Sequence, residues 1–218
     1  MSDRRARVEG AVARLAELLA RTAAGVEKKR AFTCAGCDAH CCKVGRNGML
    51  VTRLEAEAIV ARLREDPALR PRVAELARRV SDTVRRHGLR AADATGAQTY
   101  TCPFLDEHNR CAIHGRGQPL GCITFMPMRG GGCDQHVPEF ETALDAMARL
   151  NDEVYGPNGW RPMLIPVAVE RALAAEVRDS RPGSRSRTGR SSRRRRPGSS
   201  RSSSCTRSRR RRSRSRRR

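Results

Sequence analysis

Four cysteines stand within nine residues of the chain, in the stretch CAGCDAHCC that runs from Cys34 to Cys42. Cys34 and Cys37 have the two-residue spacing that lets one chain reversal aim two thiolates at a single ion. Cys41 and Cys42 are adjacent, and adjacent side chains of an extended chain point to opposite faces. We therefore expect three ligands of this run to serve one centre. The fourth thiol is expected to face a second centre or a reaction.

Four further cysteines can complete the set, and they are Cys102, Cys111, Cys122 and Cys133. Eight cysteines allow two four-thiolate sites, or one such site with four cysteines left over. Metal ligation also supplies folding free energy to the loop-rich region that holds them. Three histidines near these cysteines, His40, His114 and His136, could replace a thiolate, but we interpret them as polar loop residues because the cysteines suffice.

Thiolates in this number suit two kinds of metal group. Zinc accepts four thiolates in closed structural sites. Iron–sulfur clusters also take four cysteines and commonly draw three from one tight run. The sequence therefore predicts an iron–sulfur cluster or zinc and leaves the choice between them open.

Disulfides are the competing interpretation, and the cellular compartment separates the two. The N-terminal segment contains Arg14, Glu17 and Arg21 inside its most apolar part, so it lacks the apolar core of a signal peptide. No 18-residue apolar run occurs in the sequence, which argues against a membrane span. We therefore expect a cytoplasmic protein whose body cysteines are reduced or metal-bound.

The net charge of +22 is concentrated at one end of the chain. Residues 181–218 hold 18 Arg, 12 Ser and no acidic residue, whereas residues 1–180 hold 27 Lys and Arg against 23 Asp and Glu. We predict a cysteine-cluster metal-binding domain over 1–180 and a disordered Arg/Ser-rich tail over 181–218. The tail could bind nucleic acid without sequence preference, or it could be an unselected extension of a GC-rich coding sequence.

Periodicity and capping signals predict a mainly α fold. Helices are expected over 4–24, over 53–64 behind a Thr52–Glu55 capping box, from Pro71 to Gly88, from Pro138 through Val154, and over 164–178. The runs TYTCPFL and CAIH, separated by DEHNR, predict a small β-hairpin with Cys102 and Cys111 on its arms. We expect these helices to pack around a loop-rich cysteine and metal cluster.

Three segments together resemble the YkgJ-type cysteine-cluster family, which is described as a zinc- or iron-chelating domain with a CxxCxxxCC signature. They are CAGCDAHCC, the helix start VTRLEAEAI, and CPFLDEHNRCAIHGRGQPLGCITFMP from Cys102 to Pro127, and the resemblance spans roughly residues 32–135. The family pattern covers Cys34, Cys37, Cys41, Cys42, Cys102, Cys111 and Cys122, and matches Cys133 less directly. The resemblance implies metal chelation, including by an iron–sulfur cluster, without fixing a reaction.

One departure from the family pattern concerns charge. The family usually has Arg-Pro before the third cysteine of the second block and often Arg after it, whereas this chain has Gln118-Pro119 and then Ile123. The change weakens any inference that a cationic side chain stands beside the cluster.

Three functions follow from these observations. The first is a metal-binding protein whose partner is an unidentified protein or small molecule. The second is a cluster-containing redox or methyl-transfer enzyme with a reactive cysteine in the adjacent pair, since a related cysteine-rich segment occurs in flagellin lysine N-methylases. The third is a nonspecific nucleic-acid binder that acts through the tail.

Overall fold

The structure is a computed structural model that describes residues 2–27, 39–91, 97–127, 133–134 and 138–179. Its helices are α1 (Ser2–Glu27), α2 (Arg53–Glu65), α3 (Val73–His87), α4 (Leu120–Thr124), α5 (Pro138–Tyr155) and α6 (Ile165–Asp179), with 3₁₀ turns η2 (His40–Cys42) and η3 (Arg70–Arg72). Two short antiparallel pairs join β1 (Leu50–Val51) to β4 (Met163–Leu164) and β2 (Met126–Pro127) to β3 (Cys133–Asp134). The mainly α fold with a small β component is confirmed.

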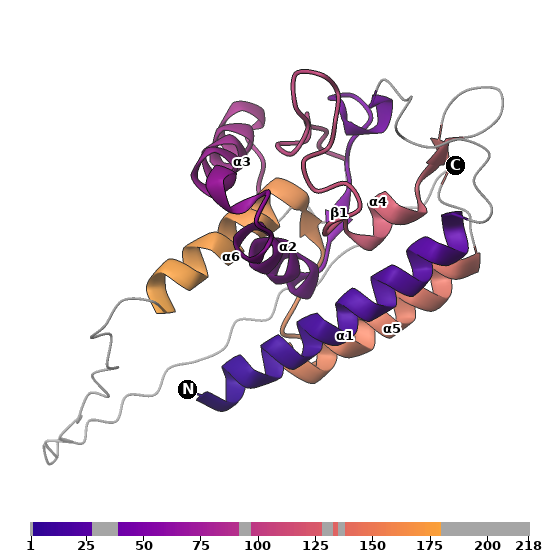
Figure 1. Cartoon of the computed structure of the whole chain (residues 1–218), viewed down its shortest axis with the longest axis vertical. Helices are drawn as coiled ribbons and strands as arrows, with labels where there is room; N and C mark the ends of the chain where they lie inside the picture. The colour runs from indigo at the N-terminus through magenta and orange to yellow at the C-terminus, as the bar shows by residue number, and fades with distance from the viewer. Residues whose placement is uncertain (1, 28–38, 92–96, 128–132, 135–137, 180–218) are drawn as a thin grey trace, which may run out of the picture. The chain divides into compact units, whose positions relative to one another are not determined.

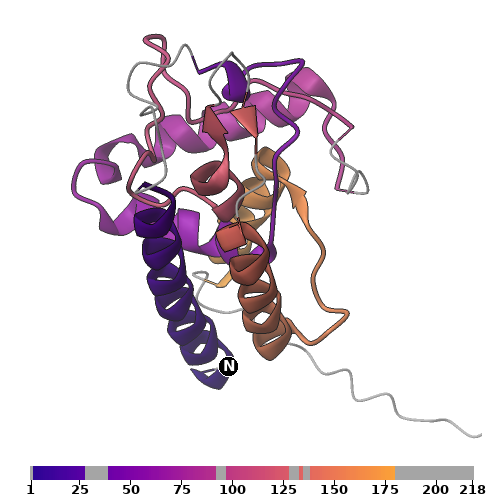
Figure 2. The same cartoon turned by 90° about the vertical axis from the view of Figure 1, so that its right-hand side faces the viewer.

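Helices α1 and α5 lie side by side and run in opposite directions (Figures 1 and 2). Arg14 of α1 pairs with Glu153 of α5 at 2.7 Å, and Gly25 lies beside Glu139 at the other end of the pair. Apolar residues at helical spacing form their interface. The buried members of this core cluster are Ala11, Leu15, Ala143 and Met147, joined by Leu54 and Leu120.

Helix α2 contributes to both core clusters of the body and therefore positions the elements around it. Leu54 packs in the α1–α5 cluster, whereas Ile59 and Leu63 belong to the larger cluster with Leu76 of α3 and Val169 of α6. Figure 1 shows α2 with α6 next to it.

The start of α2 is buried and capped by side chains. The predicted capping box is present, because the Thr52 hydroxyl accepts from the Glu55 N–H at 3.2 Å and the Glu55 carboxylate accepts from the Thr52 N–H at 2.7 Å. Asn151 of α5 accepts from the Leu54 N–H at 3.1 Å and donates to the Met147 carbonyl at 2.9 Å. A side chain from another helix thus satisfies one of the first N–H groups of α2.

One predicted helix ends where expected, and the predicted hairpin is much shorter than expected. Gly88 ends α3 in the left-handed region at φ 59°, as the sequence indicates. The predicted hairpin is reduced to one antiparallel bridge between Leu105 and Cys111. The pairing of β1 with β4 was not predicted, because it joins the residues before α2 to those before α6 across more than 100 positions.

Contacts divide the chain into two units, Met1–Ser184 and Arg185–Arg218, and every described residue belongs to the first. The predicted tail, residues 181–218, lies outside the described residues, so its disorder and its nucleic-acid binding stay predictions. In the described part of the chain, no helix has both the length and the hydropathy to cross a membrane.

The end of α2 is tied to the loop that leads into α4. Asp66 accepts from the Ala68 N–H at 2.8 Å and pairs with the Arg116 guanidinium at 3.1 Å. Arg62 donates to the Arg116 carbonyl at 2.8 Å. The Ala68 hydrogen bond, followed by the charges of Arg116 and Arg62, lowers the pKa of Asp66 below its usual value.

We predict that Asp66→Asn lowers the thermal unfolding midpoint at neutral pH. Because the folded-state pKa of Asp66 lies below the unfolded value, its carboxylate stabilises the fold above the unfolded pKa, and this contribution is lost as the pH falls through the folded pKa. The difference from the parent protein should therefore shrink as the pH is lowered to about 2. Calorimetry across that range measures it, with the exposed Asp145→Asn as control. A deficit that is independent of pH would contradict the assignment.

Candidate metal centre

Five of the eight predicted ligands are described with their side chains. Cys41 and Cys42 lie in η2, Cys102 and Cys111 lie in the loop region before α4, and Cys122 lies in α4. All five are thiols, with no disulfide among them. Cys34 and Cys37 lie outside the described residues, and Cys133 is placed in β3 without a described side chain. His40 and His114 are exposed, and His136 lies outside the described residues.

Main-chain hydrogen bonds bring the two cysteine segments together. The Cys102 N–H donates to the Cys42 carbonyl at 2.8 Å, and the Tyr100 N–H donates to the Asn47 carbonyl at 3.0 Å. The buried Tyr100 also donates its hydroxyl to the Met49 carbonyl at 3.0 Å. The chain leaving η2 is therefore fixed against the chain entering the second cysteine segment.

The adjacent pair has a different geometry from the one expected. The prediction that Cys41 and Cys42 point to opposite faces assumed an extended chain, but both lie in a 3₁₀ turn that follows Ala39 at φ 58°. Successive residues in such a turn are separated by about 120° of rotation. The two Sγ atoms accordingly lie 4.0 Å apart. The opposite-face argument was wrong, and one neighbourhood can contain both thiols.

The two thiols of the pair nevertheless have different neighbours. Cys41 acts electrostatically on Cys102 and on Cys122, and it lines a pocket. Cys42 packs against the larger core cluster and acts on Tyr100. Cys102, Cys111 and Cys122 belong to or pack against the same core cluster as Cys42, so both members of the pair lie near the other thiols.

A tight turn holds Cys111 opposite Leu105. The Asp106 N–H donates to the Arg110 carbonyl at 2.8 Å, and the Asp106 carboxylate accepts from the Arg110 N–H at 2.7 Å. Asn109 adopts the left-handed conformation at φ 59°, which Asn tolerates better than most residues. The acidic side chain of Asp106 thus shapes the turn that presents Cys111.

Glu55 positions the third cysteine segment. Its buried carboxylate, already engaged with Thr52, also accepts from the Leu120 N–H at 2.8 Å. Leu120 is the first residue of α4, which carries Cys122. Burial raises the pKa of Glu55, and the backbone hydrogen bonds from Thr52 and Leu120 oppose that shift. One carboxylate therefore links the start of α2 to the start of α4.

Burial and neighbouring thiols shift the pKa of two of these cysteines. Burial raises the pKa of Cys102 to about 12, and the charge of Cys111 adds to this rise. Desolvation likewise raises the pKa of Cys122 well above its usual value. The charges of Cys102, Cys111 and Cys41 raise it further. The thiols of Cys102 and Cys122 therefore stay protonated near neutral pH unless a cation compensates their thiolate charge.

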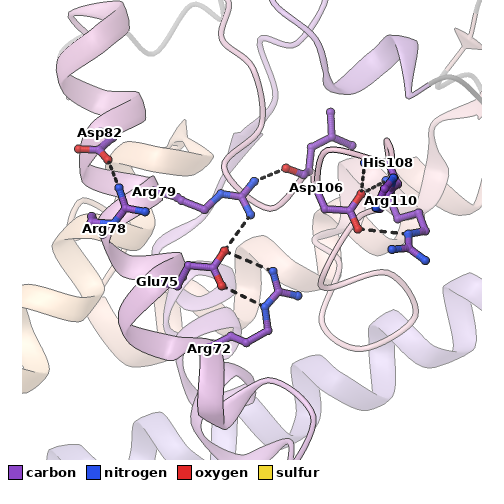
Figure 3. A network of polar contacts seen from close by, with 9 residues as sticks. Arg72, Glu75, Arg78, Arg79, Asp82, Asp106, His108 and Arg110 are labelled. Atoms are coloured by element: carbon purple, nitrogen blue, oxygen red, sulfur yellow. Dashed lines mark hydrogen bonds and ion pairs between the residues drawn. The ribbon is translucent and has the colours of Figure 1, made fainter.

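Arg79 brings a cation to this region from α3, as Figure 3 shows. Its guanidinium donates to the Leu105 carbonyl and pairs with Glu75 at 3.5 Å, and Glu75 is also bound by Arg72 at 3.2 Å. The charge of Arg79 lowers the pKa of Cys102, although less than burial raises it. The sequence suggested a loss of cationic charge here, but a helix outside the cysteine segments supplies it.

A pocket of about 540 Å³ adjoins Cys41. Cys41 and Glu55 line it together with residues 46–52, and apolar side chains of Phe125, Phe140 and Met147 form another part of its wall. This volume lies within the range of small-molecule sites. The predicted ligand Cys41 is therefore next to a space that a small molecule could enter.

The described thiols are near one another without forming a complete set of ligands. Among the described residues, no group of three or more His, Cys, Asp or Glu side chains is arranged to hold a metal ion. The predicted ligands Cys34, Cys37 and Cys133 have no described side chains. The thiol-only character of the gathered groups fits zinc or an iron–sulfur cluster better than a cation that prefers oxygen.

We predict that Glu55→Ala destabilises the protein by about 3 kcal/mol, because buried N–H groups of Thr52 and Leu120 lose their acceptor. Urea unfolding measures the loss. Glu65→Ala in the same helix is the matched control, and since Glu65 is exposed it should change stability by less than about 0.5 kcal/mol. Equal effects of the two substitutions would show that the link to α4 contributes nothing.

Comparisons of this chain with models of known families, with curated proteins and with solved structures found no match. The resemblance to the YkgJ-type family therefore stays a prediction based on the cysteine segments themselves.

Proposed function

We propose that this protein binds a metal group, zinc or an iron–sulfur cluster, through thiolates of its clustered cysteines. The observation that carries the proposal is the gathering of thiols from three separate segments of the body, because Cys102 lies in one core cluster and Cys42, Cys111 and Cys122 pack against it. Cys41 joins them through Cys42, since their Sγ atoms lie 4.0 Å apart. Cys42 lies beside Cys41, and Cys34, Cys37 and Cys133 are further candidate ligands.

The chemistry of these thiols supports a resident cation. Burial and the charges of neighbouring thiols raise the pKa of Cys102 and Cys122, so their thiolates are unfavourable in the absence of positive charge. A bound metal group would stabilise the thiolates, contribute to the folding free energy, and either close a structural site or carry electrons. Arg79 would contribute part of the compensating charge near Cys102.

The arrangement of the chain supports the same proposal. The cysteines lie on short, irregular segments that are tied to helices by single hydrogen bonds, such as those of Glu55 to Leu120 and of Arg79 to Leu105. Some of their apolar residues, such as Tyr100 and Phe104, are buried in the core, but the segments contain little regular secondary structure. Metal ligation is a physical means of ordering them.

Metal analysis of the full chain, purified without oxygen, tests the proposal. We expect stoichiometric zinc, or iron with acid-labile sulfide and a visible absorption band. Cys102→Ser and Cys122→Ser should each lower the metal content severalfold. Cys205→Ser is the matched control, because Cys205 is the ninth cysteine and belongs to the Arg/Ser-rich segment. A folded, metal-free protein would overturn the proposal.

A second function, redox or methyl-transfer catalysis with a reactive cysteine, is favoured by the pocket beside Cys41. A thiol that lines a cavity can meet a small substrate, whereas Cys102 is buried. This function does not require Cys41 to be a metal ligand. The other thiols would then hold the group.

Alkylation of the metal-loaded protein separates the two functions. If Cys41 is reactive, iodoacetamide should modify it at least tenfold faster than Cys102 and without release of metal, as measured by peptide mass spectrometry. Modification of Cys205, in the Arg/Ser-rich segment, provides an internal reference for reagent activity. Protection of Cys41 until the metal is removed would instead assign it as a ligand.

A further inference from the structure

A second pocket, of about 640 Å³, is formed by described residues of α2, the segment before β4, and α6. It shares no lining residue with the pocket beside Cys41, and no described cysteine lines it. Its floor includes small apolar residues of α6, Ala168, Ala172 and Ala175. The pocket is therefore a separate site, and its properties do not depend on the proposed metal centre.

Arginines dominate the charge of this pocket. The lining residues include Arg53, Arg161, Arg171 and Arg178, and one carboxylate, Glu57. Glu57 is already engaged, because it pairs with Arg53 at 3.1 Å and accepts from the Tyr155 hydroxyl at 2.6 Å. Arg53 in turn lies over the Tyr155 ring, 4.3 Å from its centroid. The carboxylate is thus neutralised by the arginine next to it.

The remaining three arginines leave the pocket positively charged. Within the described part of the chain, none of Arg161, Arg171 and Arg178 forms an ion pair with a carboxylate, and Arg171 contacts the Met163 sulfur at 3.4 Å. Guanidinium groups bind phosphate through planar pairs of N–H donors. Three of them around one cavity favour an anion that carries more than one charge.

The loop before β4 adds an aromatic wall. Trp160 lines the pocket and is fixed by a hydrogen bond from its indole N–H to Asp152 at 2.7 Å. The path of the loop requires glycine, because a Cβ atom at Gly159 would lie 1.8 Å from the Tyr155 carbonyl oxygen. This close approach, with Gly156 at φ 78°, determines where Trp160 and Arg161 enter the pocket wall.

We propose that this pocket binds a nucleotide-class ligand, a phosphorylated small molecule with a planar ring. The three arginines would bind the phosphates, and Trp160 would contact the ring. The volume lies within the range of about 300–1,000 Å³ found for small-molecule sites. A phosphate alone would leave Trp160 without a contact, and a planar ring alone would leave the three arginines without an anion. A ligand with both groups should therefore bind best.

The fluorescence of Trp160 gives a local test in the full chain, because Trp160 is the single tryptophan of the protein. We expect adenosine diphosphate to quench this fluorescence saturably, and expect pyrophosphate and adenosine each to bind at least tenfold more weakly. Equal binding of pyrophosphate and adenosine diphosphate would overturn the proposed contact with the ring.

Substitution of the exposed arginines tests the charged part of the site. Arg171→Gln and Arg161→Gln should each weaken binding of adenosine diphosphate at least fivefold. Arg149→Gln is the matched control, because the substitution removes the same charge from an exposed residue that does not line the pocket. Circular dichroism verifies that each variant is folded. Unchanged affinity in both pocket variants would overturn the proposal.

Discussion

The buried carboxylate of Glu55 is the interaction on which the cysteine region depends. It accepts hydrogen bonds from the first turns of two helices, at the Thr52 and Leu120 N–H groups. A charged group in this position is unfavourable unless its donors remain in place. Helix α2 packs in both core clusters. The hydrogen bond from Leu120 to Glu55 therefore fixes α4, and with it Cys122, relative to the core of the body.

Arginines from the helices hold the segments between the cysteines. Arg79 of α3 donates to the Leu105 carbonyl, and Arg62 of α2 donates to the Arg116 carbonyl. Main-chain carbonyls in irregular segments need donors that secondary structure does not supply. Long side chains on rigid helices meet this need, so the cysteine loops are attached to the frame at individual carbonyl groups and not through a sheet.

The helices could be predicted from sequence because their signals are local. The Thr52–Glu55 capping box and Gly88 at the end of α3 both appear in the structure as expected. The link from Glu55 to Leu120 and the cap of α2 by Asn151 could not be predicted, since each joins residues 65 and 97 positions apart. Burial of an amide or a carboxylate has no local signature in a single sequence.

The sequence indicated which cysteines lie near one another better than it indicated how their side chains are oriented. The pattern of cysteines identified thiols that the structure does bring together, including Cys102 and Cys122. The prediction that Cys41 and Cys42 point to opposite faces was wrong, because Ala39, in the left-handed region, precedes a 3₁₀ turn. Nothing in CAGCDAHCC specifies that turn, because alanine rarely adopts this conformation.

The position of Arg79 shows why a motif comparison can misjudge electrostatics. Gln118 and Ile123 stand where the resembling family has arginines, and from the motif alone this suggests a site without a nearby cation. The pKa of the Cys102 thiol depends on how near a charge lies, and not on which segment carries that charge. Arg79 of α3 lies near enough to lower it. The same guanidinium fixes the Leu105 carbonyl in the turn that presents Cys111. A cation on a helix can therefore position the loop and offset thiolate charge together.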